Sequence, residues 1–282
     1  MPYVAPRRRR PSINSVPKYL VAILFAMLAA FPFAFMVSAS FKTSGEFLSN
    51  PFWLPETATM ENFGGLWTPE FGRYFMNSIV ITGVSVVGTV TLGTLAAYPL
   101  SRMNLRMNPL ILVLFLAGMM IPIHVTLIPI YVLTQELGLF DNIAALFGPF
   151  IAFNLPITVY IMVGFFKQVP ESILSAARID GAGVWTVFRR ILVPLSVPAI
   201  STVAIVNFIA IWNDFIFPLV LLNDSGNYPL PLGLSDFASQ YRIDVPGTMA
   251  ALVVASLPTI LFFLVAQEKV VAGLGAGAIH GE

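Results

Sequence analysis

The chain has no cysteine, only two histidines and few charged side chains. Without cysteine it can form no disulfide, no iron–sulfur cluster and no thiol nucleophile. The two histidines, His124 and His280, leave no room for a histidine-rich metal site or a credible Ser-His-Asp triad. Charged residues make up 10% of the chain, whereas a typical soluble domain contains about 25%. This scarcity of charge argues against a soluble protein.

A nucleotide-binding motif is also missing. Gly83 and Gly88 have the spacing of the two glycines of a phosphate-binding loop, but Thr89 and Val90 follow where that loop has Lys and Ser or Thr. The sequence contains no His-Glu-x-x-His zinc motif either. We therefore expect a non-catalytic chain with no cofactor or metal of its own. Any ATP chemistry would belong to a partner chain.

Apolar residues dominate what is present. They make up 57% of the 282 residues, and the mean hydropathy is +0.84. This composition excludes disordered, fibrous and nucleic-acid-binding proteins and predicts an all-α integral membrane protein. A helix needs about 20 apolar residues to cross a bilayer. Six stretches satisfy this requirement: Tyr19–Ser40, Met76–Leu100, Leu110–Leu133, Ile143–Phe166, Ser196–Leu222 and Thr248–Gln267.

The basic residues predict the orientation of these six spans. Six spans place both termini on the same side of the membrane. Twelve of the fifteen Lys and Arg residues lie in the two terminal segments and in the loops after the second and fourth spans; the other three are Lys42, Arg73 and Arg242. Because basic loops stay in the cytoplasm, we expect both termini to be cytoplasmic.

The chain divides into a basic cytoplasmic N-terminus at 1–18, a transmembrane domain at 19–267 and a cytoplasmic tail at 268–282. The arginines Arg7–Arg10 precede the first span in the manner of a secretory signal. The apolar run that follows is longer than a signal core, so we expect an uncleaved anchor. Its arginines would contact anionic lipid rather than nucleic acid.

Two features within the spans leave alternatives open. Ser85, Thr89, Gly93 and Ala97 are each four residues apart and form a small-residue face, which fits either packing within the bundle or a subunit interface. Candidates for a translocation path are Asn207, Asn213 and Asp214. Asn207 and Asp214 are seven residues apart and would share a face of the fifth span. Asp214 would lie about 27 Å along that helix, near its outer boundary. It fits either a path-lining or a hydrated structural role.

The loop at 167–195 has the pattern of two short helices joined at a glycine. Pro170 and Glu171 suit a first helical turn. Asp180-Gly181 would end this helix, because glycine readily adopts the left-handed conformation. Val184, Val187, Phe188 and Ile191 then form the apolar side of a second helix. The loop would either pack under the bundle or face a soluble partner.

This segment resembles the EAA loop of the membrane subunits of bacterial ATP-binding-cassette importers. That family's pattern is Glu-Ala-Ala, then Gly after three residues, then a later Ile-x-Leu-Pro. The corresponding residues are Ser175-Ala176-Ala177, Asp180-Gly181-Ala182 and Ile191-Leu192-Val193-Pro194. The resemblance implies that Ser175, Ala176, Ala177, Asp180, Gly181 and Ala182 dock an ATPase. Ser175 departs from the family's Glu, and Glu171, one turn upstream, is a candidate substitute. We call residues 167–195 the EAA-like loop.

The resemblance extends over nearly the whole chain. Trp212-Asn213-Asp214 is similar to the Trp-Asn-Asp/Glu of carbohydrate permeases, and the glycine-containing segment from Gln267 to Gly281 is similar to their ending. The length resembles the smaller permease of maltose-type systems. The resemblance implies half of a translocation path, most simply for a sugar or oligosaccharide, with polyols or glycerol phosphates as alternatives. It also implies a second homologous permease, two cytoplasmic ATPase subunits that bind ATP and Mg²⁺, and an extracytoplasmic solute-binding protein.

Two other classes compete with this interpretation. An ion-coupled secondary carrier would use Asp214 as its coupling carboxylate, but such carriers often contain inverted repeats and mid-membrane broken helices. The sequence has no convincing repeated halves, and Asp214 lies near a membrane boundary. A membrane-embedded enzyme would need a catalytic set of residues that is missing. The energy source separates the first two classes: ATP depletion stops an importer, whereas a proton uncoupler alone stops a carrier.

Overall fold

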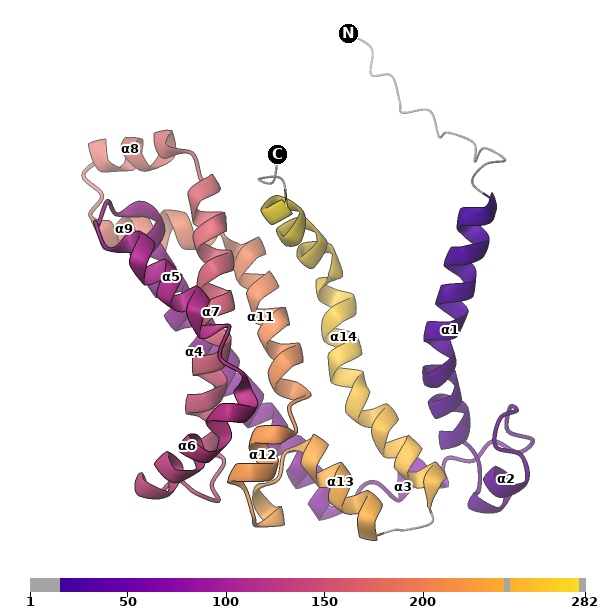
Figure 1. Cartoon of the computed structure of the whole chain (residues 1–282). Coiled ribbons are helices and arrows are strands. Elements are labelled where there is room, and N and C mark those ends of the chain that lie inside the picture. The colour runs from indigo at the N-terminus through magenta and orange to yellow at the C-terminus, as the bar shows by residue number, and fades with distance from the viewer. Residues whose placement is uncertain (1–15, 241–243, 279–282) are drawn as a thin grey trace. The chain divides into compact units, whose positions relative to one another are not determined.

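A computed structural model describes residues 16–240 and 244–278 (Figure 1). Every regular element within these residues is helical, which confirms the predicted all-α class. The contacts divide the chain into two units. The first comprises residues 1–66 and 243–253, and the second comprises residues 67–242 and 254–282. The predicted basic segment 1–18 lies mostly outside the described residues.

The first unit contains α1 (Val16–Ser40), α2 (Ser44–Ser49) and α3 (Glu61–Gly64). Within the first unit, the most apolar stretch of α1 is exposed. The connection after α1 is organised by Lys42, whose side chain is fully buried. Its ammonium group donates to the carbonyl oxygens of Asn50 at 2.6 Å and Pro51 at 3.2 Å. These bonds satisfy two backbone carbonyl groups just beyond α2, so the ammonium group of Lys42 is paired with carbonyl oxygens.

The second unit is built on the close pairing of α4 (Pro69–Arg102) with α7 (Ala144–Gln168). Thr68 caps α4 by accepting the N–H of Phe71 at 3.2 Å. A Cβ atom at Gly93 would lie 2.5 Å from Cγ2 of Thr158 in α7, so only glycine allows the two backbones to approach this closely. The predicted small-residue face is buried within this unit. Its role here is packing within the bundle.

The third predicted span is not one continuous helix. It consists of α5 (Asn108–Gly118) and α6 (Ile123–Glu136), which are bent by 93° at the break. Pro122 precedes α6 with an extended backbone, and a proline cannot donate the hydrogen bond that would continue α5. The predicted span Leu110–Leu133 is therefore divided between two helices, because continuous hydropathy does not reveal a bend.

The fifth predicted span is also interrupted. Helix α11 runs over Val197–Trp212 and α12 over Ile216–Leu221, with Asn213–Phe215 between them. Asp214 accepts the N–H of Phe217 at 3.1 Å and so begins α12 instead of continuing α11. The expectation that Asn207 and Asp214 share one helix face was therefore wrong. The 27 Å placement of Asp214 along a single helix was wrong for the same reason.

The remaining helices are η3 (Ser225–Asn227), α13 (Leu230–Gln240) and α14 (Val245–Ala278). Helix α14 continues beyond the predicted end of the sixth span at Gln267. Trp212 of α11 donates its ring N–H to the carbonyl oxygen of Ala255 in α14 at 3.2 Å. The ring of Phe208 stacks on Phe262 with centroids 4.3 Å apart. Within the second unit, these contacts hold α14 against α11.

The helices give four to six candidate membrane spans among the described residues. Four single helices are long and apolar enough: 17–40, 69–102, 144–168 and 245–264. Two bent pairs bring the total to six if each is one span. One is α5 with α6; the other joins residues 184–195 to α11 with a 73° bend. In Figure 1, the helices α8 and α9 of the EAA-like loop lie at one end of α7, and α6 and α12 lie at the other.

Candidate functional site

The EAA-like loop begins with α8 (Glu171–Ile179), which follows α7 after Pro170. Glu171 is in its first turn and Arg178 in its last, so both charges complement the helix dipole. Of its nine residues, all of which the structure describes, only Leu174 is buried. The helix therefore presents most of its surface outward.

The motif residues of α8 form a Schellman turn. Gly181 adopts a left-handed conformation with φ of 82°. The N–H of Gly181 donates to the carbonyl oxygen of Arg178 at 3.0 Å, and the N–H of Ala182 donates to that of Ala177 at 2.9 Å. These two bonds satisfy carbonyls at the end of the helix that would otherwise have no partner. Ala177, Gly181 and Ala182 thus form one local turn. The predicted helix–glycine–helix arrangement is confirmed.

The second half of the loop packs against α4. It contains α9 (Val184–Val187), the π-helix η2 (Phe188–Leu192) and α10 (Val193–Leu195). The hydroxyl of Tyr98 in α4 donates to the carbonyl oxygen of Val184 at 3.1 Å. The Tyr98 ring lies 5.2 Å from that of Phe188. The prediction that Phe188 belongs to the apolar side of this helix is confirmed.

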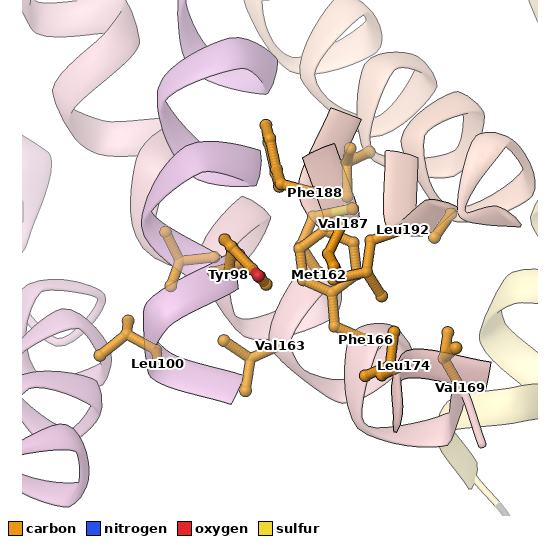
Figure 2. Close-up of a cluster of buried hydrophobic side chains, with 14 residues drawn as sticks. Tyr98, Leu100, Met162, Val163, Phe166, Val169, Leu174, Val187, Phe188 and Leu192 are labelled. Carbon is orange, nitrogen blue, oxygen red and sulfur yellow. The ribbon is translucent and has the colours of Figure 1, made fainter. Parts of the chain in front are cut away.

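One apolar cluster joins both halves of the loop to the ends of α4 and α7 (Figure 2). Figure 2 shows Leu174 of α8 beside Phe166 of α7, with Val187, Phe188 and Leu192 gathered nearby. The side chains of Phe166, Leu174 and Leu192 are fully buried. The loop is therefore packed against the bundle on one face while its other face stays open.

The six predicted docking residues fall on both faces of the loop. Ala176, Asp180 and Gly181 are exposed, whereas Ser175, Ala177 and Ala182 are partly covered. The structure brings them together around the Schellman turn. It also exposes apolar side chains that the motif did not identify: Ile179 is 86% exposed, Trp185 60% and Val184 58%. The predicted apolar side is therefore divided: Val187 and Phe188 are buried against the bundle, whereas Val184 is exposed.

Glu171 is engaged by arginines of this chain. Its Oε2 lies 3.1 Å from Nη1 of Arg102, and its Oε1 lies 2.9 Å from Nη1 of Arg178. Sequence reasoning singled out Glu171 but not Arg102, which is 69 residues away in the chain. An arginine at the end of an apolar span was the only local signal of this contact.

The three path candidates are not gathered into one site with the loop. Asn207 is fully buried within the bundle and donates to Oγ1 of Thr158 in α7 at 2.9 Å. Its Oδ1 has no hydrogen-bond partner among the described residues. Asn213 is exposed, and Asp214 is partly exposed at the start of α12. Asn207 thus joins α7 to α11, while Asn213 and Asp214 occupy the break between α11 and α12.

A polar clamp lies at the end of the second unit opposite the loop. The carboxylate of Asp141, between α6 and α7, accepts the backbone N–H groups of Asn223 and Asp224, each at 2.8 Å. These bonds, that of Asn223 foremost, hold the pKa of Asp141 below its ordinary value because they favour the charged carboxylate. Asp141 has a φ of 58°, a conformation that aspartate tolerates better than most residues. The clamp fixes the loop before α7 to the segment after α12.

No cluster of three or more His, Asp or Glu residues able to hold a metal occurs in the part of the chain that the structure describes. The assembled features are therefore an exposed helical turn at one end of the bundle and, within the bundle, an apolar helix that is interrupted at the polar residues Asn213 and Asp214.

Residues 89–274 match the family of binding-protein-dependent transport system inner membrane components. This segment contains the EAA-like loop, the Asn207–Thr158 contact and the break after Trp212. It covers well over half of the chain. The chain belongs to this family of transporter membrane subunits.

Curated relatives match over almost the full length. The putative ABC transporter permease protein ORF2 of a Caldicellulosiruptor species is 39% identical over 93% of this chain and 96% of its own length. The trehalose/maltose transport system permease protein MalG of Thermococcus litoralis is 33% identical over 93% and 95%, respectively. A solved bacterial ABC transporter that imports the acidic polysaccharide alginate aligns with a TM-score of 0.80 at 23% identity, over 93% of this chain and 99% of that one. This structural match supports the importer-permease fold.

Proposed function

We propose that this chain is a permease subunit of an ATP-driven importer of a sugar or oligosaccharide. It would form half of the translocation path and leave ATP hydrolysis to a partner. The observation that carries the proposal is the exposed Schellman turn of the EAA-like loop. The apolar cluster of Figure 2 packs this loop against α4 and α7. Family membership and the sugar-transport names of relatives support it.

The docking surface would comprise the exposed part of this turn. Ala176, Asp180 and Gly181 offer small or polar groups, and Ile179 and Trp185 offer apolar ones. Ser175, Ala177 and Ala182 would act beneath them by shaping the turn. Apolar side chains that are exposed beside a helical turn are typical of a surface that binds another protein. We propose a cytoplasmic ATPase as this partner.

Orientation and partners complete the proposal. Cytoplasmic termini put the EAA-like loop in the cytoplasm, where ATP is present. A second homologous permease, a pair of ATPases and an extracytoplasmic solute-binding protein would complete the assembly. A solved alginate ABC transporter of similar fold is in complex with a periplasmic protein that holds an alginate pentasaccharide, which supports the expectation of a solute-binding protein. Asn207, Asn213 and Asp214 remain our candidates for the path.

The absence of native cysteine makes site-directed crosslinking a direct test. Ile179→Cys in the assembled complex should crosslink to the ATPase, because Ile179 is 86% exposed on the proposed docking surface. Ile128→Cys, at a side chain 76% exposed on α6, is the matched control and should not. A membrane-impermeant thiol reagent should label Ile179→Cys only from the cytoplasmic side.

The energy source tests the alternative of a carrier based on Asp214. Uptake that stops on ATP depletion and survives an uncoupler supports the importer. The importer is refuted if uptake survives ATP depletion but stops with an uncoupler, and if the tagged chain purifies without an ATPase. The family assignment favours the importer over the carrier.

A further inference from the structure

Arg102 connects three helix ends through one side chain. It is the last residue of α4, and its side chain is only 10% exposed. One nitrogen of its guanidinium group, Nη2, donates to the carbonyl oxygens of Phe166 and Val169 at the end of α7. The other, Nη1, lies 3.1 Å from Oε2 of Glu171 in the first turn of α8. The end of one span is thereby bonded to the end of another and to the start of the EAA-like loop.

The chemistry of these contacts requires an arginine. A guanidinium group has five N–H donors in a planar fork, so it can serve several acceptors in fixed directions, whereas a lysine is a compact point charge. At the end of α7, the carbonyl oxygen of Phe166 also accepts the N–H of Val169 at 3.2 Å. The guanidinium group adds a second donor to that oxygen and a donor to the carbonyl oxygen of Val169. A positive charge also suits the C-terminal ends of α4 and α7, and Glu171 suits the N-terminal end of α8.

Few other contacts hold α8 to the bundle. Leu174 is its one buried residue, and the turn at Gly181 joins it to α9. The carboxylate of Glu171 is bound at one side by Arg102 and at the other by Arg178, which lies near the far end of α8. A displacement of α8 by a docked partner would therefore pull on Arg102, and through it on α4 and α7 together.

We propose that Arg102 is a positioning residue that transmits movement of α8 to α4 and α7. This inference rests on the proposed function, since it assigns a coupling route to the same docking loop. The ion pair with Glu171 by itself contributes little to folding stability, because the Glu171 side chain is 57% exposed and ion pairs open to water are weak. We therefore expect loss of this ion pair to lower the amount of solute transported per ATP hydrolysed.

The test compares Arg102→Gln, Arg102→Lys, Glu171→Gln and the double variant Arg102→Gln/Glu171→Gln in the full complex with its ATPase and binding protein. Proteoliposomes would report solute uptake and ATP hydrolysis in the same sample. We expect both glutamine variants to retain the ATPase and to hydrolyse ATP, with uptake per ATP reduced at least about fivefold, the lower end of usual coupling effects. Arg102→Lys should not restore the ratio, and the double variant should resemble Arg102→Gln because the two residues act through one contact.

Two further variants separate this route from its neighbours. Arg106→Gln, at an exposed arginine four residues beyond Arg102, should match the wild type. Arg178→Gln removes the second partner of Glu171 and leaves the contact with α4, so it should reduce the ratio less than Glu171→Gln. An unchanged ratio in Glu171→Gln, or an equal loss in Arg178→Gln, would overturn the inference. So would loss of the ATPase from Glu171→Gln, which would make Glu171 a docking residue. Failure of the wild-type chain to bind any ATPase would instead refute the proposed function.

Discussion

The backbone N–H of Ala182 donates to the carbonyl oxygen of Ala177, 2.9 Å away and five residues upstream. This bond closes the turn that ends α8, and it requires the left-handed backbone of Gly181 between the two alanines. The family motif around Gly181 therefore has a local physical meaning before any partner is considered. It also yields a direct prediction.

Gly181→Val should uncouple the transporter. A Cβ atom at Gly181 would meet nothing within 4 Å, so the penalty comes from the backbone: a left-handed conformation costs an L-residue about 1–2 kcal/mol, and β-branching makes it worse. We expect normal membrane insertion, continued ATP hydrolysis and loss of uptake. Gly181→Asn is the matched control, because asparagine tolerates this conformation, and should retain uptake. Unimpaired uptake by Gly181→Val would refute the docking model.

Ser175→Glu should strengthen docking of the ATPase. The substitution restores the acidic residue of the family pattern at a partly covered position. It also places a carboxylate three residues before Arg178, a spacing at which opposite charges attract on a helix. The expected result is more ATPase recovered with the purified chain and faster uptake. Ser175→Gln has nearly the same size without the charge and serves as the control. Equal recovery with all three side chains would argue against a role for this position.

Leu174→Ala and Ile179→Ala should separate folding from docking on one helix. Leu174 is fully buried, and truncating a buried leucine typically costs about 2–5 kcal/mol. We expect a lower melting temperature for the detergent-solubilised Leu174→Ala chain. Ile179 is 86% exposed, so Ile179→Ala should melt like the wild type but retain less ATPase. A melting temperature lowered equally by both changes would contradict this division of the two faces.

Acid should weaken the clamp at Asp141. Its folded-state pKa lies below the ordinary value of 3.8, so its bonds to Asn223 and Asp224 stabilise the fold at pH values above 3.8. This contribution disappears as the pH falls through the lowered pKa. Asp141→Asn keeps the left-handed backbone and the acceptor oxygen but removes the charge. The stability advantage of the wild type over Asp141→Asn, measured by thermal unfolding, should be constant from neutral pH to about 4 and shrink below it. A gap that stays constant at lower pH would show that Asp141 does not titrate in this way.

The sequence by itself determined the features that depend on near neighbours in the chain. Long apolar runs determined the membrane class, and the Asp180-Gly181 pair determined the helical turn of the EAA-like loop, because hydropathy and local hydrogen bonds are properties of adjacent residues. The four-residue spacing of Ser85, Thr89, Gly93 and Ala97 indicated a close helix contact for the same reason. It did not reveal that the contacted helix is α7.

Only the tertiary structure decided which distant residues meet. Arg102 reaches Glu171 across 69 positions and Asp141 reaches Asn223 across 82, and no local pattern specifies such pairs. The 93° bend between α5 and α6 and the break at Asp214 also escaped the sequence, because an apolar run has the same hydropathy whether the helix is straight or interrupted. At the break, the bond from the N–H of Phe217 to Asp214 satisfies a backbone group that the interruption leaves without a helical partner.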